Sequence, residues 1–79
     1  MTTMTLYNYI TDNMPRIKEG VQLGIISTTV LHHWEIYSRF DVYRKQGQSV
    51  EISALWAGAD LKCGDRTVFR VKQRMEKEI

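Results

Sequence analysis

The chain has 79 residues, of which 43% are hydrophobic and 25% charged, with one proline and five glycines. This composition is typical of one small globular domain and not of a disordered tail. A chain of this length buries only about 60% of its unfolded surface, which is enough for one core but not for a substrate pocket walled on all sides. We therefore expect a single domain over residues 1–79, with no enzymatic activity, no cofactor and no small-molecule substrate.

The sequence also carries few signs of an oxidising or membrane environment. Cys63 has no second cysteine to pair with and cannot build a zinc site unaided. The first ten residues lack the basic and apolar regions of a signal peptide, and the longest apolar stretch falls far below the ~20 residues of a membrane span. We expect a cytoplasmic protein with no membrane partner.

Charge is unevenly distributed, although the net charge of +2 is small. Residues 62–79 hold six basic and three acidic side chains, a net of +3, whereas residues 1–61 have a net of −1. A basic end of this size is compatible with a phosphate-facing surface and also with an ordinary solvated helix face. Charge alone does not decide between the two.

Apolar spacing and helix start and stop signals predict an all-α chain of four or five short helices, because strand patterns are weak throughout. The first helix is predicted over residues 5–13. Asp12 or Asn13 caps a second helix, with Pro15 in its first turn, which continues to about Leu23.

The third predicted helix is the longest, over residues 29–46. Gly24 ends the preceding helix, and Ser27 or Thr28 supplies the new N-cap. Because its apolar and aromatic side chains form one broad stripe, we expect it to be the core helix. The stripe comprises Val30, His33, Trp34, Ile36, Tyr37, Phe40, Asp41 and Tyr43.

Two further helices are predicted after the core helix. Gly47 ends the core helix and Ser49 caps a fourth helix over residues 50–59. A fifth helix runs over residues 65–77. The turn between them consists of Lys62, Cys63 and Gly64.

Residues 54–73 place small and apolar side chains in a distinctive order. Ala57 and Gly58 form a small pair inside the fourth helix, where a second helix can cross at short distance. Apolar side chains stand on both sides of the turn and again along the following helix. They are Leu61 and Cys63 at the turn, then Val68 and Val71. Val68 belongs to the run Thr67, Val68, Phe69 and Arg70.

In these positions the chain resembles the helix-turn-helix DNA-binding family, in its bacterial and phage homeodomain-like form. The resemblance implies that the first helix, starting at Ser49, braces a second helix that enters the major groove, which is about 12 Å wide. It assigns base-edge contacts to Arg66, Phe69, Arg70 and Gln73. Arginine pairs with guanine, glutamine with adenine, and an exposed phenylalanine can touch a thymine methyl group.

The expected phosphate contacts fix the register of the protein on DNA and carry no sequence information. Family members often have glycine where this chain has Lys62, so we expect a left-handed residue there, at a cost of ~1 kcal/mol. The fourth helix has no Lys or Arg, and residues before it can supply the backbone contacts on that side. The phosphate candidates are Lys62, Thr67, Lys72 and Arg74, with Arg44, Lys45 and Ser49.

Residues 16–35 contain a weaker echo of the same pattern. Glu19 replaces the small residue, His33 replaces the second anchor, and aromatic side chains follow in place of arginines. We expect a degenerate copy that packs or mediates dimerisation; the alternative, a second DNA-reading unit, would expose Thr28, Thr29 and His32. The offset of 38 pairs Gly20 with Gly58, Leu23 with Leu61, Ile25 with Cys63, Thr29 with Thr67 and Val30 with Val68.

The remaining His, Cys and aromatic residues indicate neither a metal site nor a catalytic site. His32 and Glu35 lie one turn apart and, with His33, fall short of the three or four ligands of a zinc site, so no metal is expected. We expect Cys63 to be a small buried residue without a catalytic partner. The aromatic residues are expected in the core instead of forming a platform for single-stranded nucleic acid.

The family resemblance thus implies a small transcriptional regulator or mobile-element accessory protein that binds duplex DNA. One such helix covers few base pairs, so we expect a homodimer, with residues 1–48 as the interface and residues 49–79 as the helix-turn-helix. The alternative belongs to a different functional class: a helical adaptor that binds another protein and does not bind DNA. Its contact surface would be the Trp56 helix or the Trp34 stripe.

Overall fold

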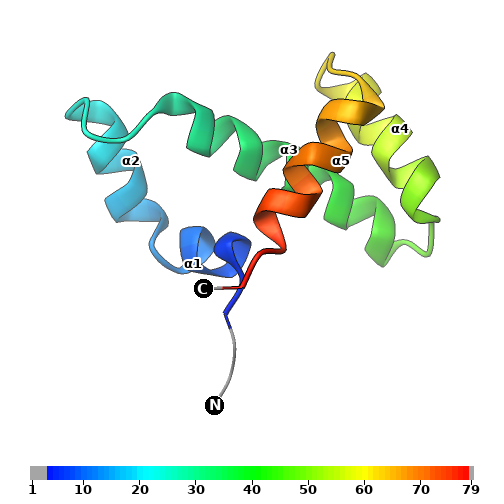
Figure 1. Cartoon of the computed structure of the whole chain (residues 1–79), viewed down its shortest axis with the longest axis horizontal. Helices are drawn as coiled ribbons and strands as arrows, with labels where there is room; N and C mark the ends of the chain where they lie inside the picture. The colour runs from blue at the N-terminus through cyan, green and yellow to red at the C-terminus, as the bar shows by residue number, and fades with distance from the viewer. Residues whose placement is uncertain (1–3, 79) are drawn as a thin grey trace.

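A computed structural model describes residues 4–78. Its helices are α1 (Leu6–Asp12), α2 (Met14–Gln22), α3 (Thr28–Lys45), α4 (Val50–Asp60) and α5 (Asp65–Met75). The all-α class is confirmed (Figure 1). The molecule is flat, measuring 35 × 34 × 18 Å along its principal axes.

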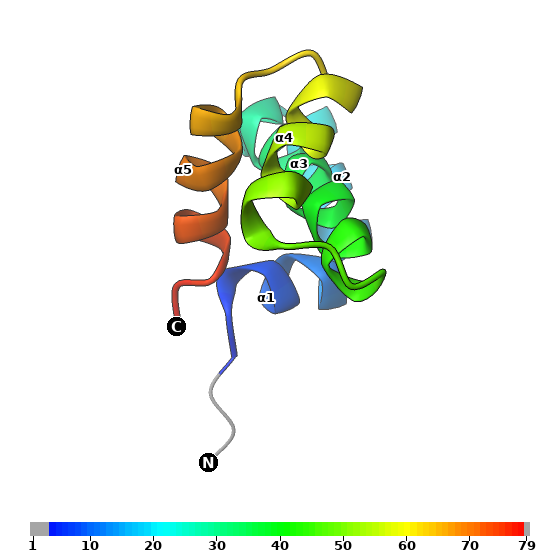
Figure 2. The same cartoon turned by 90° about the vertical axis from the view of Figure 1, so that its right-hand side faces the viewer.

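α3 is the central helix, as its apolar stripe predicts. Its N-cap is Ser27, whose side chain accepts a hydrogen bond from the Thr29 N–H. The helix buries Ile36 and Phe40 completely or nearly so. α2 lies beside the start of α3, α4 beside its end, and α5 crosses between them (Figures 1 and 2). Both C-terminal helices, α4 and α5, therefore pack against the single long helix α3.

The core is small and is formed mainly where α3, α4 and α5 meet. Its apolar side chains come from all three helices, and α1 adds one more. Trp34, Tyr37, Leu61 and Cys63 pack around it in partly buried positions, so Cys63 is less buried than the sequence suggested. The buried apolar residues are Ile10, Ile36, Phe40, Ala54, Ala57, Val68, Val71 and Met75.

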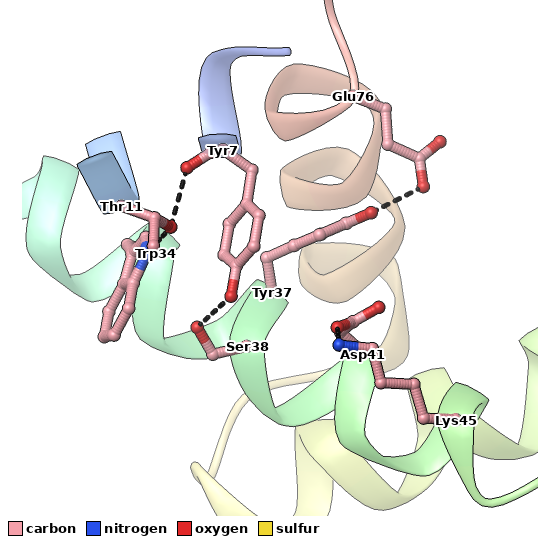
Figure 3. Close-up of polar contacts among 8 residues, drawn as sticks. All are labelled: Tyr7, Thr11, Trp34, Tyr37, Ser38, Asp41, Lys45 and Glu76. Atoms are coloured by element: carbon pink, nitrogen blue, oxygen red, sulfur yellow. Dashed lines mark hydrogen bonds and ion pairs between the residues drawn. The ribbon is translucent and has the colours of Figure 1, made fainter. Parts of the chain in front are cut away.

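Tyr7, Trp34 and Tyr37 make contacts within the chain that join α1 to α3. The Tyr7 ring packs on Tyr37, with ring centroids 4.6 Å apart, and its hydroxyl shares a 3.0 Å hydrogen bond with Ser38 Oγ. The Trp34 indole N–H donates to Thr11 Oγ1 at 2.9 Å (Figure 3). These contacts fasten α1 to α3.

α1 also meets the chain after α5. The Leu6 N–H donates to the Lys77 carbonyl oxygen at 2.9 Å, and Thr5 and Glu78 form an isolated antiparallel bridge. α5 ends at Met75 and not at the predicted residue 77, because the following residues turn away to make these bonds. The two ends of the described chain are thereby held together (Figure 1).

The predicted start and stop signals lie where expected. Gly24 and Gly47 both adopt positive φ, at 75° and 93°, and stand two residues after the last residues of α2 and α3, respectively. Asn13 precedes α2 as predicted, but its side chain makes no cap hydrogen bond and instead donates to the Tyr9 carbonyl oxygen.

Candidate nucleic-acid interface

α4 and α5 approach each other closely at Gly58. A methyl group built there would lie 2.7 Å from the Cys63 carbonyl oxygen. The Cys63 N–H donates to the Gly58 carbonyl oxygen at 2.8 Å, which draws the turn onto α4. The small pair Ala57 and Gly58, both buried, therefore has the packing role that the sequence predicts.

The turn between the two helices depends on a left-handed residue. Lys62 has a φ of 57°, the only positive value at a non-glycine residue among residues 4–78, which confirms the expected conformation. Gly64 then serves as the N-cap of α5 and has no side chain to accept a bond from the first turn. Asp65 Oδ1 accepts from the Arg66 N–H at 2.9 Å instead.

α5 has one buried face and one exposed face. Val68, Val71 and Met75 are at most 2% exposed and point into the core, as predicted. The opposite face presents positions i, i+3, i+4 and i+7 to solvent, so the structure brings the four base-contact candidates together on one surface. These are Arg66, Phe69, Arg70 and Gln73, which we call the α5 outer face.

The two arginines of the α5 outer face differ from Lys72 and Arg74 in having no side-chain partner within the part of the chain that the structure describes. Neither guanidinium takes part in an ion pair or side-chain hydrogen bond with residues 4–78, which leaves both groups available to a ligand. Lys72 instead pairs with Glu76 at 2.8 Å, and Arg74 Nη1 lies 3.1 Å from His33 Nδ1. The side chains of Lys72 and Arg74 are therefore already paired with other side chains of the protein.

The remaining phosphate candidates are divided between two places. Lys62 and Thr67 are exposed beside the turn, near the start of α5. The other three lie at the opposite end of α4: Arg44 donates to the Gln48 carbonyl oxygen at 2.7 Å, Lys45 pairs with Asp41 at 3.0 Å, and Ser49 Oγ caps the Ile52 N–H. The hydrogen bond that Lys45 donates to Asp41 raises the pKa of Lys45.

A polar network that the sequence does not predict joins α3 to α5 and to Glu76, the residue after α5. The Tyr37 hydroxyl donates to Glu76 Oε2 at 2.9 Å (Figure 3). Burial, and then the bond to Glu76, raise the pKa of Tyr37. Burial, and then the positive charges of Arg74 and His32, lower the pKa of His33. The Lys72–Glu76 spacing of four residues is readable from sequence, whereas contacts across about 40 residues leave no local signal.

The turn between α2 and α3 shares three backbone hydrogen bonds with the turn between α4 and α5. The Ile25 N–H donates to the Gly20 carbonyl oxygen at 2.9 Å, as Cys63 does to Gly58. Gly24 and Lys62, which stand 38 residues apart, are both left-handed. The likeness ends at the next helix, because five residues separate α2 from α3 and four separate α4 from α5.

The side chains of this first turn are arranged differently. Ile25 is 78% exposed, whereas its counterpart Cys63 is partly buried. Ile26 packs against Gly20 in its place. The candidate contacts of a second DNA-reading unit, Thr28, Thr29 and His32, are exposed, but they stand beside Glu35 and not beside arginines.

Within residues 4–78, no three His, Cys, Asp or Glu side chains lie close enough to hold a metal ion, and no helix is long and apolar enough to cross a membrane. A shallow groove of about 260 Å³ runs along α3 at Glu35, Ser38, Arg39 and Val42. Comparison with protein-family models, curated proteins and solved structures found no match.

Proposed function

We propose that this protein binds duplex DNA by placing the α5 outer face in the major groove. The observation that carries the proposal is the pair Arg66 and Arg70, two exposed guanidinium groups one helical turn apart and without partners among residues 4–78. Arginine groups kept free on a rigid helix face are suited to bidentate contact with guanine O6 and N7.

The geometry of an α-helix fits this role. Residues four apart rise about 6 Å along the axis, close to two base-pair steps of about 3.4 Å each. Gln73 and Phe69 on the same face add an adenine-type contact and an apolar contact. Lys62 and Thr67 lie free beside the turn for phosphate, while Lys72 and Arg74 would exchange Glu76 and His33 for phosphate oxygens.

The same proposal includes a homodimer acting in the cytoplasm as a small transcriptional regulator or mobile-element accessory protein. One helix contacts few base pairs, and a second copy would supply a second half-site. The N-terminal half is the proposed interface. Tyr7, Trp34 and Tyr37 are engaged with one another within the chain. The apolar surface left for a second copy includes Tyr9, Leu23 and Ile25, which are 44%, 66% and 78% exposed.

Fluorescence anisotropy against a pool of random duplexes at about 50 and 200 mM salt tests the proposal. Binding driven by phosphate contacts should fall by orders of magnitude between the two concentrations. After selection of a preferred duplex, Arg66→Ala and Arg70→Ala should each weaken binding by about 1–3 kcal/mol. Arg16→Ala, which removes an exposed arginine from α2, is the matched control and should have little effect.

Two results would count against DNA binding. One is the absence of binding at low salt, which would favour the helical adaptor. The other is an equal loss in the Arg16 and Arg70 variants, which would show that only overall charge matters.

A further inference from the structure

The contact between His33 and Arg74 joins the first half of α3 to the last turn of α5. Arg74 Nη1 donates a hydrogen bond to His33 Nδ1 at 3.1 Å. A guanidinium group has donors and no acceptor, so the Nδ1 atom must be the acceptor. The ring is therefore neutral in this contact, with its proton on Nε2. Burial, and then the charges of Arg74 and His32, lower the pKa of His33, which favours the neutral form.

Arg74 is held less firmly than Lys72, the other cation near the end of α5. Lys72 pairs with the Glu76 carboxylate at 2.8 Å, so opposite charges attract. Arg74 makes no ion pair with a carboxylate of residues 4–78, and its side-chain partner is the neutral ring of His33. Histidine is the side chain that ordinarily changes its charge between pH 5 and 8. The partner of Arg74 is therefore a group whose charge can switch in this range.

Protonation of His33 would break the contact. The Nδ1 atom would gain a hydrogen atom and lose its acceptor lone pair, leaving two cationic donors face to face. The charges that act on the ring come from Arg74 on α5 and His32 beside it on α3, and none comes from α1, α2, α4 or residues 76–78. No carboxylate of residues 4–78 forms an ion pair with the ring. Because no negative charge offsets the repulsion, the Arg74 side chain would turn away.

Release would leave Arg74 beside the surface proposed to meet DNA. Arg74 follows Arg70 by four residues and is exposed, so it stands at the edge of the α5 outer face. Its guanidinium would then join those of Arg66 and Arg70, which have no side-chain partner among residues 4–78. Arginine binds phosphate through paired N–H donors, and such a contact adds affinity regardless of base sequence.

We propose that His33 regulates DNA binding through Arg74: the neutral ring retains the guanidinium, and the protonated ring releases it to a phosphate group. This inference rests on the proposed function. Linkage requires the reverse effect as well, so a phosphate contact made by Arg74 should favour proton uptake by His33 to the same extent. Binding should therefore be tighter in mildly acidic solution.

Fluorescence anisotropy with the selected duplex, at pH 5.5 and 7.5 and equal ionic strength, tests the proposal. Affinity should be about fivefold or more higher at pH 5.5. The plot of log affinity against log salt should be steeper by about 0.9, which corresponds to one more phosphate contact. Loss of folded protein at pH 5.5 would weaken binding, so it cannot produce this gain.

Three variants separate release of Arg74 from direct attraction between DNA and a charged ring. Arg74→Ala keeps the ring and should lose most of the gain at pH 5.5, and His33→Gln should lose it too. His32→Gln is the matched control, because His32 is an exposed neighbour with no hydrogen bond to Arg74, and it should keep the gain.

NMR of the free chain tests the contact without DNA. The His33 ring should carry its proton on Nε2 at pH 7.5, and Arg74→Ala should raise the pKa of His33 because it removes a positive charge. Arg16→Ala, at an exposed arginine of α2, should leave that pKa unchanged.

Two kinds of result would overturn the regulation and leave DNA binding intact. One is duplex binding that gains nothing at pH 5.5, or gains as much in Arg74→Ala as in the unaltered chain. The other is a His33 ring protonated on Nδ1 at pH 7.5, or a His33 pKa that Arg74→Ala does not raise. A chain that binds no duplex at either pH would instead overturn the proposed function, and this inference with it.

Discussion

Gly58 offers the most direct test of how α4 and α5 are fitted together. Alanine at this position would place its methyl group 2.7 Å from the Cys63 carbonyl oxygen and 3.3 Å from the Gly64 carbonyl carbon. Both are backbone atoms, and the hydrogen bond from the Cys63 N–H to the Gly58 carbonyl oxygen fixes their position. The turn must therefore move as a whole to admit the methyl group.

The expected magnitude follows from two opposing effects. Alanine stabilises a helix interior over glycine by about 0.8–1.0 kcal/mol. Relieving the clash to an ordinary contact of 3.4 Å requires a displacement of about 0.7 Å, and overpacking of this kind costs about 1–3 kcal/mol. Because the obstacle is backbone, we take the upper part of that range and expect a net loss of about 1–2 kcal/mol in the free energy of unfolding, or about 4–16 °C in Tm.

Urea unfolding followed by circular dichroism measures this loss. Gly20→Ala is the matched control, since its methyl group would clash only with the Ile26 side chain, at 2.5 Å from Cδ1 and 2.8 Å from Cγ1, and a side chain can rotate away. We expect the Gly20 variant to lose less than the Gly58 variant. Unchanged or increased stability in Gly58→Ala, or a larger loss in Gly20→Ala, would refute the reasoning.

Three further predictions concern single side chains. Lys62→Gly should stabilise the fold by about 0.5–1 kcal/mol, because it relieves the φ of 57°; a less stable variant in urea unfolding would contradict this. Ser53→Ala should stabilise by about 1 kcal/mol, because Ser53 Oγ is buried without a hydrogen-bond partner among residues 4–78; a loss would mean that the hydroxyl has a bonding role. His33 has a lowered pKa in the folded chain. The unfolded chain therefore takes up its proton first, near pH 6.5, and stability should fall as the pH drops below that value. His33→Gln should flatten this part of the stability curve, and an unchanged slope would show that other groups cause it.

Local signals predicted most of the secondary structure. The caps at Ser27 and Ser49 and the left-handed glycines 24 and 47 place the helix ends within a few residues, because each depends only on near neighbours in the chain. The two faces of α5 were likewise readable from the spacing of Val68 and Val71. Such features need no knowledge of the tertiary fold.

Long-range contacts could not be predicted in this way. Arg74 appeared to be a free phosphate contact, but in the structure it lies against His33, 41 residues earlier. The end of α5 was misplaced for the same reason, because the Lys77 carbonyl oxygen accepts from Leu6 at the other end of the chain. Periodicity shows which face of a helix is apolar, and it does not show which polar side chains the packing will bring together.

The contact between α1 and the residues after α5 has a consequence for the thermodynamics of DNA binding. α5 is tied to α4 through the Cys63 N–H at one end and to Leu6 through the Lys77 carbonyl oxygen just beyond the other. A helix restrained on both sides loses little conformational entropy when it meets a ligand. In the proposed complex with DNA, the heat capacity change should therefore correspond to the surface buried at the interface, without the larger change that accompanies folding on binding.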